Sequence, residues 1–419
     1  MDRSTERRDR LHRLIDLARA SRGWSRARLA RELHRDPTKL YPESGNPKLD
    51  FLVHLAEVLE WPVGEVAAAV WGENAQFTPL TPERNGHADE SFEALNNACL
   101  DRYDSGDFAG MAEIAQQMYT AARTNDQRAL ACIREAGGWD GLGRYPRSLD
   151  AVRRGLAQGQ LSVNTRLILQ ANLANAQYTL WDLTPALGTT QVLAEWYEAN
   201  PPGTPRDGMR PAFVYYVRGN THRRLMAIEE ESRERHCHAG LADLGLADSL
   251  YTRLADELNI PSLHGIANTC RAGMLELQVE SGDIAPGLAV DRLLSSLDAV
   301  VDLDADASGD LLESYGWSCI FGSNIALRHL SGRPLQQAMA VFTNKALEIA
   351  DRLDNWALRE RVFTMQYTLH QQIVDATGLD LPYTIDEEDR TLITATMGRF
   401  PTFRTVGWQI LETARVVEG

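Results

Sequence analysis

Cationic side chains are concentrated at the start of this sequence. Residues 1–48 contain 13 Arg and Lys residues against 7 Asp and Glu residues, a net charge of +6. The other 371 residues contain 30 against 51, a net charge of −21. A basic segment on an acidic chain indicates a small module that binds a polyanion, attached to a body that binds something else. The alternative is an Arg-rich surface that is only solvated.

Other reactive side chains lack the spacing that catalysis or metal binding requires. His236, Cys237 and His238 are adjacent, and adjacent side chains on a helix point roughly 100° apart, so they cannot all ligate one metal ion. The glycines of 137–145 follow no strand, unlike those of a phosphate-binding loop, and the acidic run 386–389 is typical of a solvated helix start. Since the sequence contains no catalytic motif, we expect no enzyme activity, no cofactor and no metal.

Composition places the chain among ordinary soluble proteins. Hydrophobic residues make up 44% of the chain and charged residues 24%. Its 419 residues are more than one hydrophobic core usually serves, so we expect more than one domain or a repeat array. The five cysteines are widely spaced and odd in number, which favours a reducing compartment. There is neither an apolar run long enough to span a membrane nor a secretory signal at the N-terminus, so we expect a cytoplasmic protein without membrane contact.

The elements that would position the basic side chains are short helices. Residues 10–23 carry apolar residues at helical spacing, and Ser25 is placed to cap a second helix over 26–34. Asp36 followed by Pro37 predicts the start of a third helix, because Asp caps helices and Pro is tolerated at the first position. Two more helices are predicted within 49–72, the second opened by Pro62. The predicted core positions are Leu11, Leu14, Ile15, Ala18, Leu29, Ala30, Leu33, Phe51, Leu52, Leu55, Ala56, Val58 and Leu59.

This five-helix pattern over residues 10–70 resembles the repressor-type helix-turn-helix family, the Xre or Cro group. The matching residues are Leu29, Ala30, Leu33, Leu40, Glu43, Gly45, Pro47 and the run FLVHLAEVLEWPVGEV over 51–66. The sequence departs from the family at His34, where Gly is usual, and at Pro42, which should end the third helix early. The resemblance therefore implies a DNA-binding module with a shortened recognition helix.

In such modules the recognition helix contacts base edges and its surroundings hold phosphates. Matched position by position, the resemblance places Thr38, Lys39 and Tyr41 towards the bases, although packing is an alternative for Tyr41. The implied phosphate contacts are Arg26, Arg28, Arg35 and Lys48, each of which could instead be a solvated surface residue.

After a polar segment at 73–90, typical of a linker, residues 91–419 alternate apolar helical stretches with short breaks. Phe108, Tyr145 and Leu183 follow three such breaks and are 37 and 38 residues apart; later breaks at 280–284 and 330–334 are more widely spaced. The period resembles that of tetratricopeptide helical hairpins, with Trp181 replacing one turn Gly. The whole chain is thus predicted to be all-α, with a helix-turn-helix domain (1–72), a linker (73–90) and an α-solenoid (91–419). An irregular helical bundle is the alternative.

Stacked hairpins form a concave groove, on which Asn side chains can bind an extended peptide backbone. Asn97, Asn172 and Asn324 precede their turns by eight or nine residues, and Asn175 lies one helical turn beyond Asn172. These four asparagines are the predicted peptide-binding residues, and hydrogen bonds within the solenoid are the alternative. Tyr178, Tyr216, Tyr315 and Trp317 could supply pockets.

The two modules in this order resemble the peptide-responsive regulators of quorum sensing. The resemblance implies a homodimeric transcription regulator that binds a palindromic double-stranded DNA operator and responds to a short peptide or other small effector. The alternative is a protein-interaction scaffold whose degenerate helix-turn-helix no longer binds specific DNA.

Overall fold

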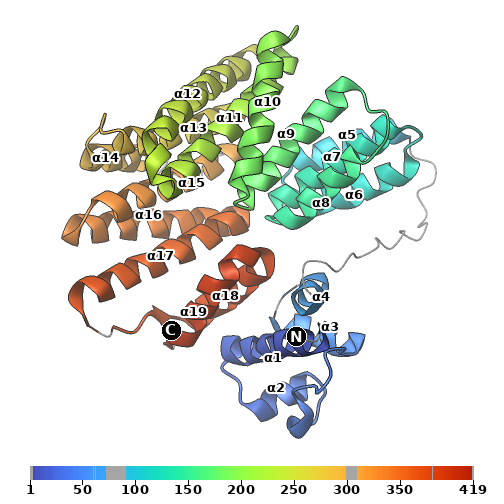
Figure 1. Ribbon diagram of the computed structural model, residues 1–419, viewed down its shortest axis with the longest axis vertical. Coiled ribbons are helices and arrows are strands. Elements are labelled where there is room, and N and C mark those ends of the chain that lie inside the picture. Colours follow the sequence, from blue (N-terminus) through green and yellow to red (C-terminus); the bar gives the residue numbers. More distant parts are fainter. Residues whose placement is uncertain are drawn as a thin grey trace. The chain divides into compact units, whose positions relative to one another are not determined.

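A computed structural model of the chain describes residues 3–59, 61, 63–71, 91–298, 309–379 and 381–417. Within these residues the chain forms nineteen α-helices and only two very short strands, so the all-α prediction is confirmed (Figure 1). None of these helices is long and apolar enough to cross a membrane. The predicted linker at 73–90 and the predicted role of Pro62 lie outside the described residues.

Two compact units make up the chain. One combines residues 1–83 with 363–419, and the other spans 84–362. The unit of the N-terminal helices thus includes residues 363–419, which the sequence predicts as part of the repeat domain.

The N-terminal module, residues 3–71, is built on a small apolar core. It contains α1 (Arg3–Arg22), α2 (Arg26–Glu32), the 3₁₀ turn η1 (Pro37–Lys39), α3 (Leu49–Leu59) and α4 (Val63–Trp71). All thirteen predicted core positions are buried, with Leu11, Ile15 and Leu55 fully so. Ser25 caps α2 as predicted, because its hydroxyl accepts a hydrogen bond from the backbone N–H of Arg28. His34, at the turn position where glycine is usual, adopts a left-handed φ of 51°.

The predicted third helix is reduced to the single 3₁₀ turn η1. Asp36 caps it as expected, accepting a hydrogen bond of 2.7 Å from the backbone N–H of Thr38. The turn cannot lengthen into an α-helix, because Pro42 disfavours helical conformation at Tyr41. The segment that was expected to be a shortened recognition helix is therefore three residues long.

The C-terminal segment of the same unit packs on the N-terminal module. It comprises α18 (Glu387–Arg399), η3 (Pro401–Phe403) and α19 (Arg404–Thr413), and it contacts α1 and α4. The strand β1 (Thr384–Ile385) precedes these helices in the sequence and the strand β2 (Arg415–Val416) follows them. The two strands pair in parallel. The indole of Trp61, only 5% exposed, donates a hydrogen bond to the backbone carbonyl of Thr394.

The second unit is a row of helical hairpins. Its helices are α5 (Phe92–Asp104), α6 (Phe108–Ala121), α7 (Asn125–Gly141), α8 (Tyr145–Leu156), α9 (Val163–Thr179), α10 (Leu183–Ala199), α11 (Pro205–Ile228), α12 (Arg233–Leu258), α13 (Leu263–Glu280), α14 (Pro286–Asp298), α15 (Gly309–His329), α16 (Gly332–Leu353) and the start of α17 (Trp356–Thr377). The predicted markers Phe108, Tyr145 and Leu183 are the first residues of α6, α8 and α10, so the three predicted turns are confirmed.

The hairpins stack as repeats. The first helices of successive hairpins, α5, α7, α9, α11, α13 and α15, each contact the next in the series, and every hairpin also packs its own two helices together. Trp181 has a φ of 64°, so it adopts the left-handed conformation that Gly106 and Gly143 adopt in the two preceding turns. The substitution of the turn glycine therefore leaves the hairpin intact.

Candidate functional site

The predicted DNA-contacting side chains of the N-terminal module lie on and around η1. Thr38, Lys39 and Lys48 are exposed. Arg26, also exposed, donates from Nε to the carbonyl oxygen of Pro37 over 2.9 Å, which ties α2 to η1. Among the described residues none of the three cations forms an ion pair, and the guanidinium carbon of Arg26 also lies 5.3 Å from the ring centre of Tyr41.

Two other predicted phosphate contacts are held against aromatic rings. The guanidinium carbon of Arg28 lies 4.7 Å from the ring centre of Trp24, and that of Arg35 lies 4.6 Å from the ring centre of Phe51. Stacking restrains these side chains without neutralising them. Both therefore remain positively charged beside η1.

Thr38 and Tyr41 each have partners within the module. The hydroxyl of Thr38 donates to the carboxylate of Asp36. The hydroxyl of half-buried Tyr41 donates to Asp16, and its ring packs edge-on to His12. Burial raises the pKa of Tyr41, with the Asp16 hydrogen bond as the second cause. Among the described residues, Lys39 is the one of the three predicted base contacts whose side chain forms no hydrogen bond, although its charge helps to lower the pKa of Asp36.

A cavity of about 680 Å³ lies within the second unit. Residues from both helices of several hairpins, and from the turns between helices, line it: Tyr103, Ser105, Gly106, Phe108, Ala136, Gly137, Asp140, Gly141, Gly143, Tyr145, Ser148, Asn172, Asn175, Phe213, Ser262, Glu313, Arg352, Leu353 and Asn355. Its volume falls within the roughly 300–1,000 Å³ typical of small-molecule sites. The cavity can therefore hold a small molecule or a short peptide segment.

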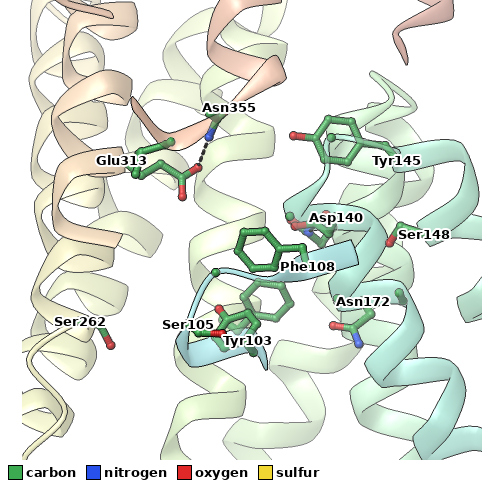
Figure 2. Close-up of a pocket in the computed structure, with 18 of the residues that line it drawn as sticks. Tyr103, Ser105, Phe108, Asp140, Tyr145, Ser148, Asn172, Ser262, Glu313 and Asn355 are labelled. Atoms are coloured by element: carbon green, nitrogen blue, oxygen red, sulfur yellow. Dashed lines mark hydrogen bonds between the residues drawn. The ribbon is translucent and has the colours of Figure 1, made fainter. Parts of the chain in front are cut away.

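Two carboxylates line the cavity from helices that are distant in the sequence. Asp140 comes from the end of α7 and Glu313 from the start of α15. In Figure 2 the side chains of Glu313 and Asn355 face those of Asp140 and Tyr145 across the cavity. Burial raises the pKa of Asp140 to about 7, and the charge of Glu313 contributes further.

Neutral donors position both carboxylates. The side-chain amide of Asn175 donates to Oδ1 of Asp140 over 3.3 Å. The indole of Trp317 and the amide of Asn355 each donate to Oε1 of Glu313 over 3.0 Å, the second of which is drawn in Figure 2. The carboxylate oxygens are thus fixed in place.

Aromatic rings and glycines shape the neighbouring wall. Tyr103 and Phe108 lie edge to face at 5.9 Å between ring centres, and Figure 2 shows Phe108 beside Asp140. A Cβ atom at Gly141 would lie 2.5 Å from the ring of Phe108, so only glycine permits this packing.

Of the four predicted peptide-binding asparagines, the structure brings two to the cavity. Asn172 and Asn175 both lie on α9 and line it. Asn324 instead donates over 3.3 Å to buried Glu276, and Asn97 is exposed and does not line the cavity. Likewise, none of Tyr178, Tyr216, Tyr315 and Trp317 is among the lining residues.

Sequence patterns did not identify Asp140, Glu313 or Arg352 as site residues. One available signal was the glycine-rich run 137–145, because glycines inside a helix indicate close approach by another group. Glu313 carried no such signal, since only the curvature of the whole repeat row brings it opposite Asp140.

Comparisons with solved structures give distant structural likenesses. The crystal structure of Bacillus thuringiensis PlcR in complex with the peptide PapR7 and DNA is similar with 12% sequence identity and a TM-score of 0.33, over 84% of this chain and 98% of that chain. No protein-family model matches the sequence, and no curated protein is significantly similar to it.

Proposed function

We propose that this chain is a sequence-specific DNA-binding transcription regulator whose repeat unit binds a small effector, most readily a short peptide. The observation that carries the proposal is the set of exposed cations in the N-terminal module: Lys39 on η1, Arg26 bonded to η1, and Lys48, none with an ion pair among the described residues. In a chain of net charge −15, such a local positive surface is suited to the phosphates of DNA.

Base reading would depend on very few side chains. Lys39 can donate to O6 or N7 of guanine, and Thr38 can contact a base once its hydroxyl leaves Asp36. Tyr41, held by Asp16, would contribute by packing. Specificity would then depend also on DNA shape and on two modules binding together as a homodimer, with half-sites about 34 Å apart or a multiple of it.

The cavity is the proposed effector site. Its lining combines aromatic rings, amides and charged groups from several repeats, so a bound ligand would hold those repeats in one arrangement. A ligand controls DNA binding in this way only if it binds one arrangement of the chain better than another. Asn172 and Asn175 are suited to the backbone of a peptide in the cavity.

One observation favours the alternative of a scaffold that no longer binds specific DNA. The element in the recognition position is only a three-residue 3₁₀ turn, which offers fewer side chains to a groove than an α-helix. The exposed cations would then give only nonspecific binding.

Selection of binding sequences from a random-sequence DNA pool by the full-length protein separates these functions. The regulator is expected to enrich a defined motif, with two related half-sites, at ~0.15 M salt. Recovery of unrelated sequences, in amounts that fall steeply with salt, would favour the scaffold.

A further inference from the structure

We propose that the ligand of the cavity carries a cationic ammonium or guanidinium group, held between the carboxylates of Asp140 and Glu313. This inference rests on the proposed effector function of the cavity and adds the chemical class of the effector. It covers both a free amine and the amino terminus or basic side chain of a peptide.

The two carboxylates are part of a built recess. They enter it from α7 and α15, and the volume of about 680 Å³ between these walls leaves room for a ligand. Asp140 forms no ion pair within the described residues, and its hydrogen-bond donor Asn175 is neutral. A cation in the recess would therefore find the Asp140 carboxylate without a positively charged partner among the described residues.

The remaining charged and titratable groups near Asp140 are few. Tyr145 and Tyr103 line the cavity, and burial raises the pKa of Tyr145 well above its usual value. Arg352 also lines the cavity but is exposed, so solvent screens its charge. Arg224, near Tyr145, is engaged elsewhere, because its guanidinium stacks over Tyr178 at 3.8 Å and donates to the carbonyl oxygen of that residue.

Enclosure makes an ionised Asp140 costly without a ligand. Burial and the neighbouring charge of Glu313 raise the pKa of Asp140 to about 7. A bound cation offsets both effects, since it attracts each carboxylate and favours the ionised form. A neutral ligand of the same shape would offset neither effect, because it brings no positive charge to the two carboxylates.

The aromatic wall suits the same ligand class. The ring of Phe108 lies beside Asp140 and packs against Tyr103, and the negative face of an aromatic ring attracts ammonium and guanidinium groups. Aromatic and carboxylate groups side by side therefore select for a cation that is joined to an apolar body.

A matched pair of probes tests the proposal on the full-length protein by titration calorimetry. Tyramine and tyrosol share the hydroxyphenylethyl body and differ only in an ammonium or a hydroxyl group. We expect tyramine to bind at least about tenfold more tightly than tyrosol at pH 8, as a close charge pair implies. Equal binding of the two probes, or binding of neither at millimolar concentration, would overturn the proposal.

Variants assign the discrimination to the cavity. In Asp140→Asn and Glu313→Gln the preference for tyramine should fall to less than about threefold, whereas Glu195→Gln, on the exposed surface of α10, should keep it. Circular dichroism of each variant checks that the fold is retained. A preference that survives in both cavity variants would place the cation elsewhere and contradict the proposal.

The source of the cation and the pH dependence give two further readouts. If the effector is a peptide, a short peptide that begins with tyrosine should bind when its amino terminus is free and should not bind when that terminus is acetylated. If tyramine binds and the peptide does not, the effector is a free amine. Tyramine affinity should drop about tenfold from pH 8 to pH 5.5, because Asp140 becomes protonated. DNA selection on the same samples keeps the two proposals separate, since a regulator without cation preference would still enrich a motif.

Discussion

The indole Nε1 of Trp61 donates a hydrogen bond to the backbone carbonyl of Thr394, joining the N-terminal module to α18. The contact is close, because a Cβ atom at Gly398 would lie 2.7 Å from the Trp61 ring. Arg404 adds a guanidinium 5.3 Å from the ring centre and an ion pair of 3.5 Å with Glu65. The C-terminal segment is thus part of the fold of the N-terminal module.

This junction predicts that Trp61→Ala destabilises the unit by about 3–5 kcal/mol, the usual cost of removing a buried large aromatic side chain. Gly398→Val should act in the same direction, because its side chain would collide with the indole. Urea unfolding followed by circular dichroism measures both effects.

Trp24→Ala is the matched control, since Trp24 is only partly buried and should cost less. A chain ending at residue 379 should likewise lose stability in α1 and α4, measured by hydrogen exchange. Unchanged exchange in those helices would show that the C-terminal segment merely touches the module.

The cap of η1 predicts an effect on DNA binding. Asp36 accepts hydrogen bonds from both the backbone N–H and the hydroxyl of Thr38, and these bonds lower its pKa, the side-chain bond being the larger cause. Asp36→Ala should weaken binding to a selected DNA sequence several-fold by loosening the turn that carries Lys39. Asp36→Asn keeps an acceptor and should stay close to wild type; equal losses in the two variants would instead indicate that the charge matters.

Asp140 predicts a pH dependence of stability whose sign follows from its raised pKa of about 7. Between about pH 4 and pH 7 the folded chain holds a proton that the unfolded chain, with a pKa near 3.9, has released. The contribution of Asp140 to stability should therefore fall as pH rises through this range and change no further above it.

Asp140→Asn removes this dependence. At pH 8 the variant should be more stable than wild type by about 1–3 kcal/mol, and at pH 4.5 the two should be nearly equal. Urea unfolding at the two pH values measures the difference, with Glu195→Gln as the control. The same difference at both pH values would mean that Asp140 does not titrate in this range.

The buried charge network around Glu276 separates the roles of the predicted asparagines. Glu276, with a side chain 2% exposed, lies 2.7 Å from Arg223 and accepts from Asn324. Glu276→Ala should cost about 3–5 kcal/mol, because it leaves the buried Arg223 uncompensated. Asn324→Ala should cost about 1 kcal/mol and leave tyramine binding unchanged. Asn97→Ala, on the surface, should alter neither stability nor tyramine binding. A loss of tyramine binding in Asn324→Ala would instead place Asn324 in the site.

Helices and turns were largely predictable from local patterns. The buried positions of α1 and α3, the Ser25 cap and the turns before Phe108, Tyr145 and Leu183 depend on residues close together in the sequence, so spacing was sufficient to find them. The length of η1 was overestimated, because the effect of Pro42 on Tyr41 disfavours a second helical turn after Lys39.

Long-range relationships were not predictable in the same way. The pairing of Trp61 with Gly398 and the approach of Asp140 to Glu313 depend on how the chain returns to distant segments. A lone Glu at 313 has the same local pattern as a solvated surface residue. Half of the predicted asparagines line the cavity because helical spacing defines a face of each helix, while the cavity occupies only part of the repeat row.

The proposed regulator function is tested most directly by the ratio of affinities for the selected DNA sequence and a scrambled one. We expect full-length wild type to show a ratio of at least about 10³ at ~0.15 M salt. Lys39→Ala should lower that ratio by a factor that corresponds to about 1–3 kcal/mol of binding free energy. Lys48→Ala should weaken binding to both sequences alike and leave the ratio unchanged. A ratio near one for the wild-type protein would contradict the account.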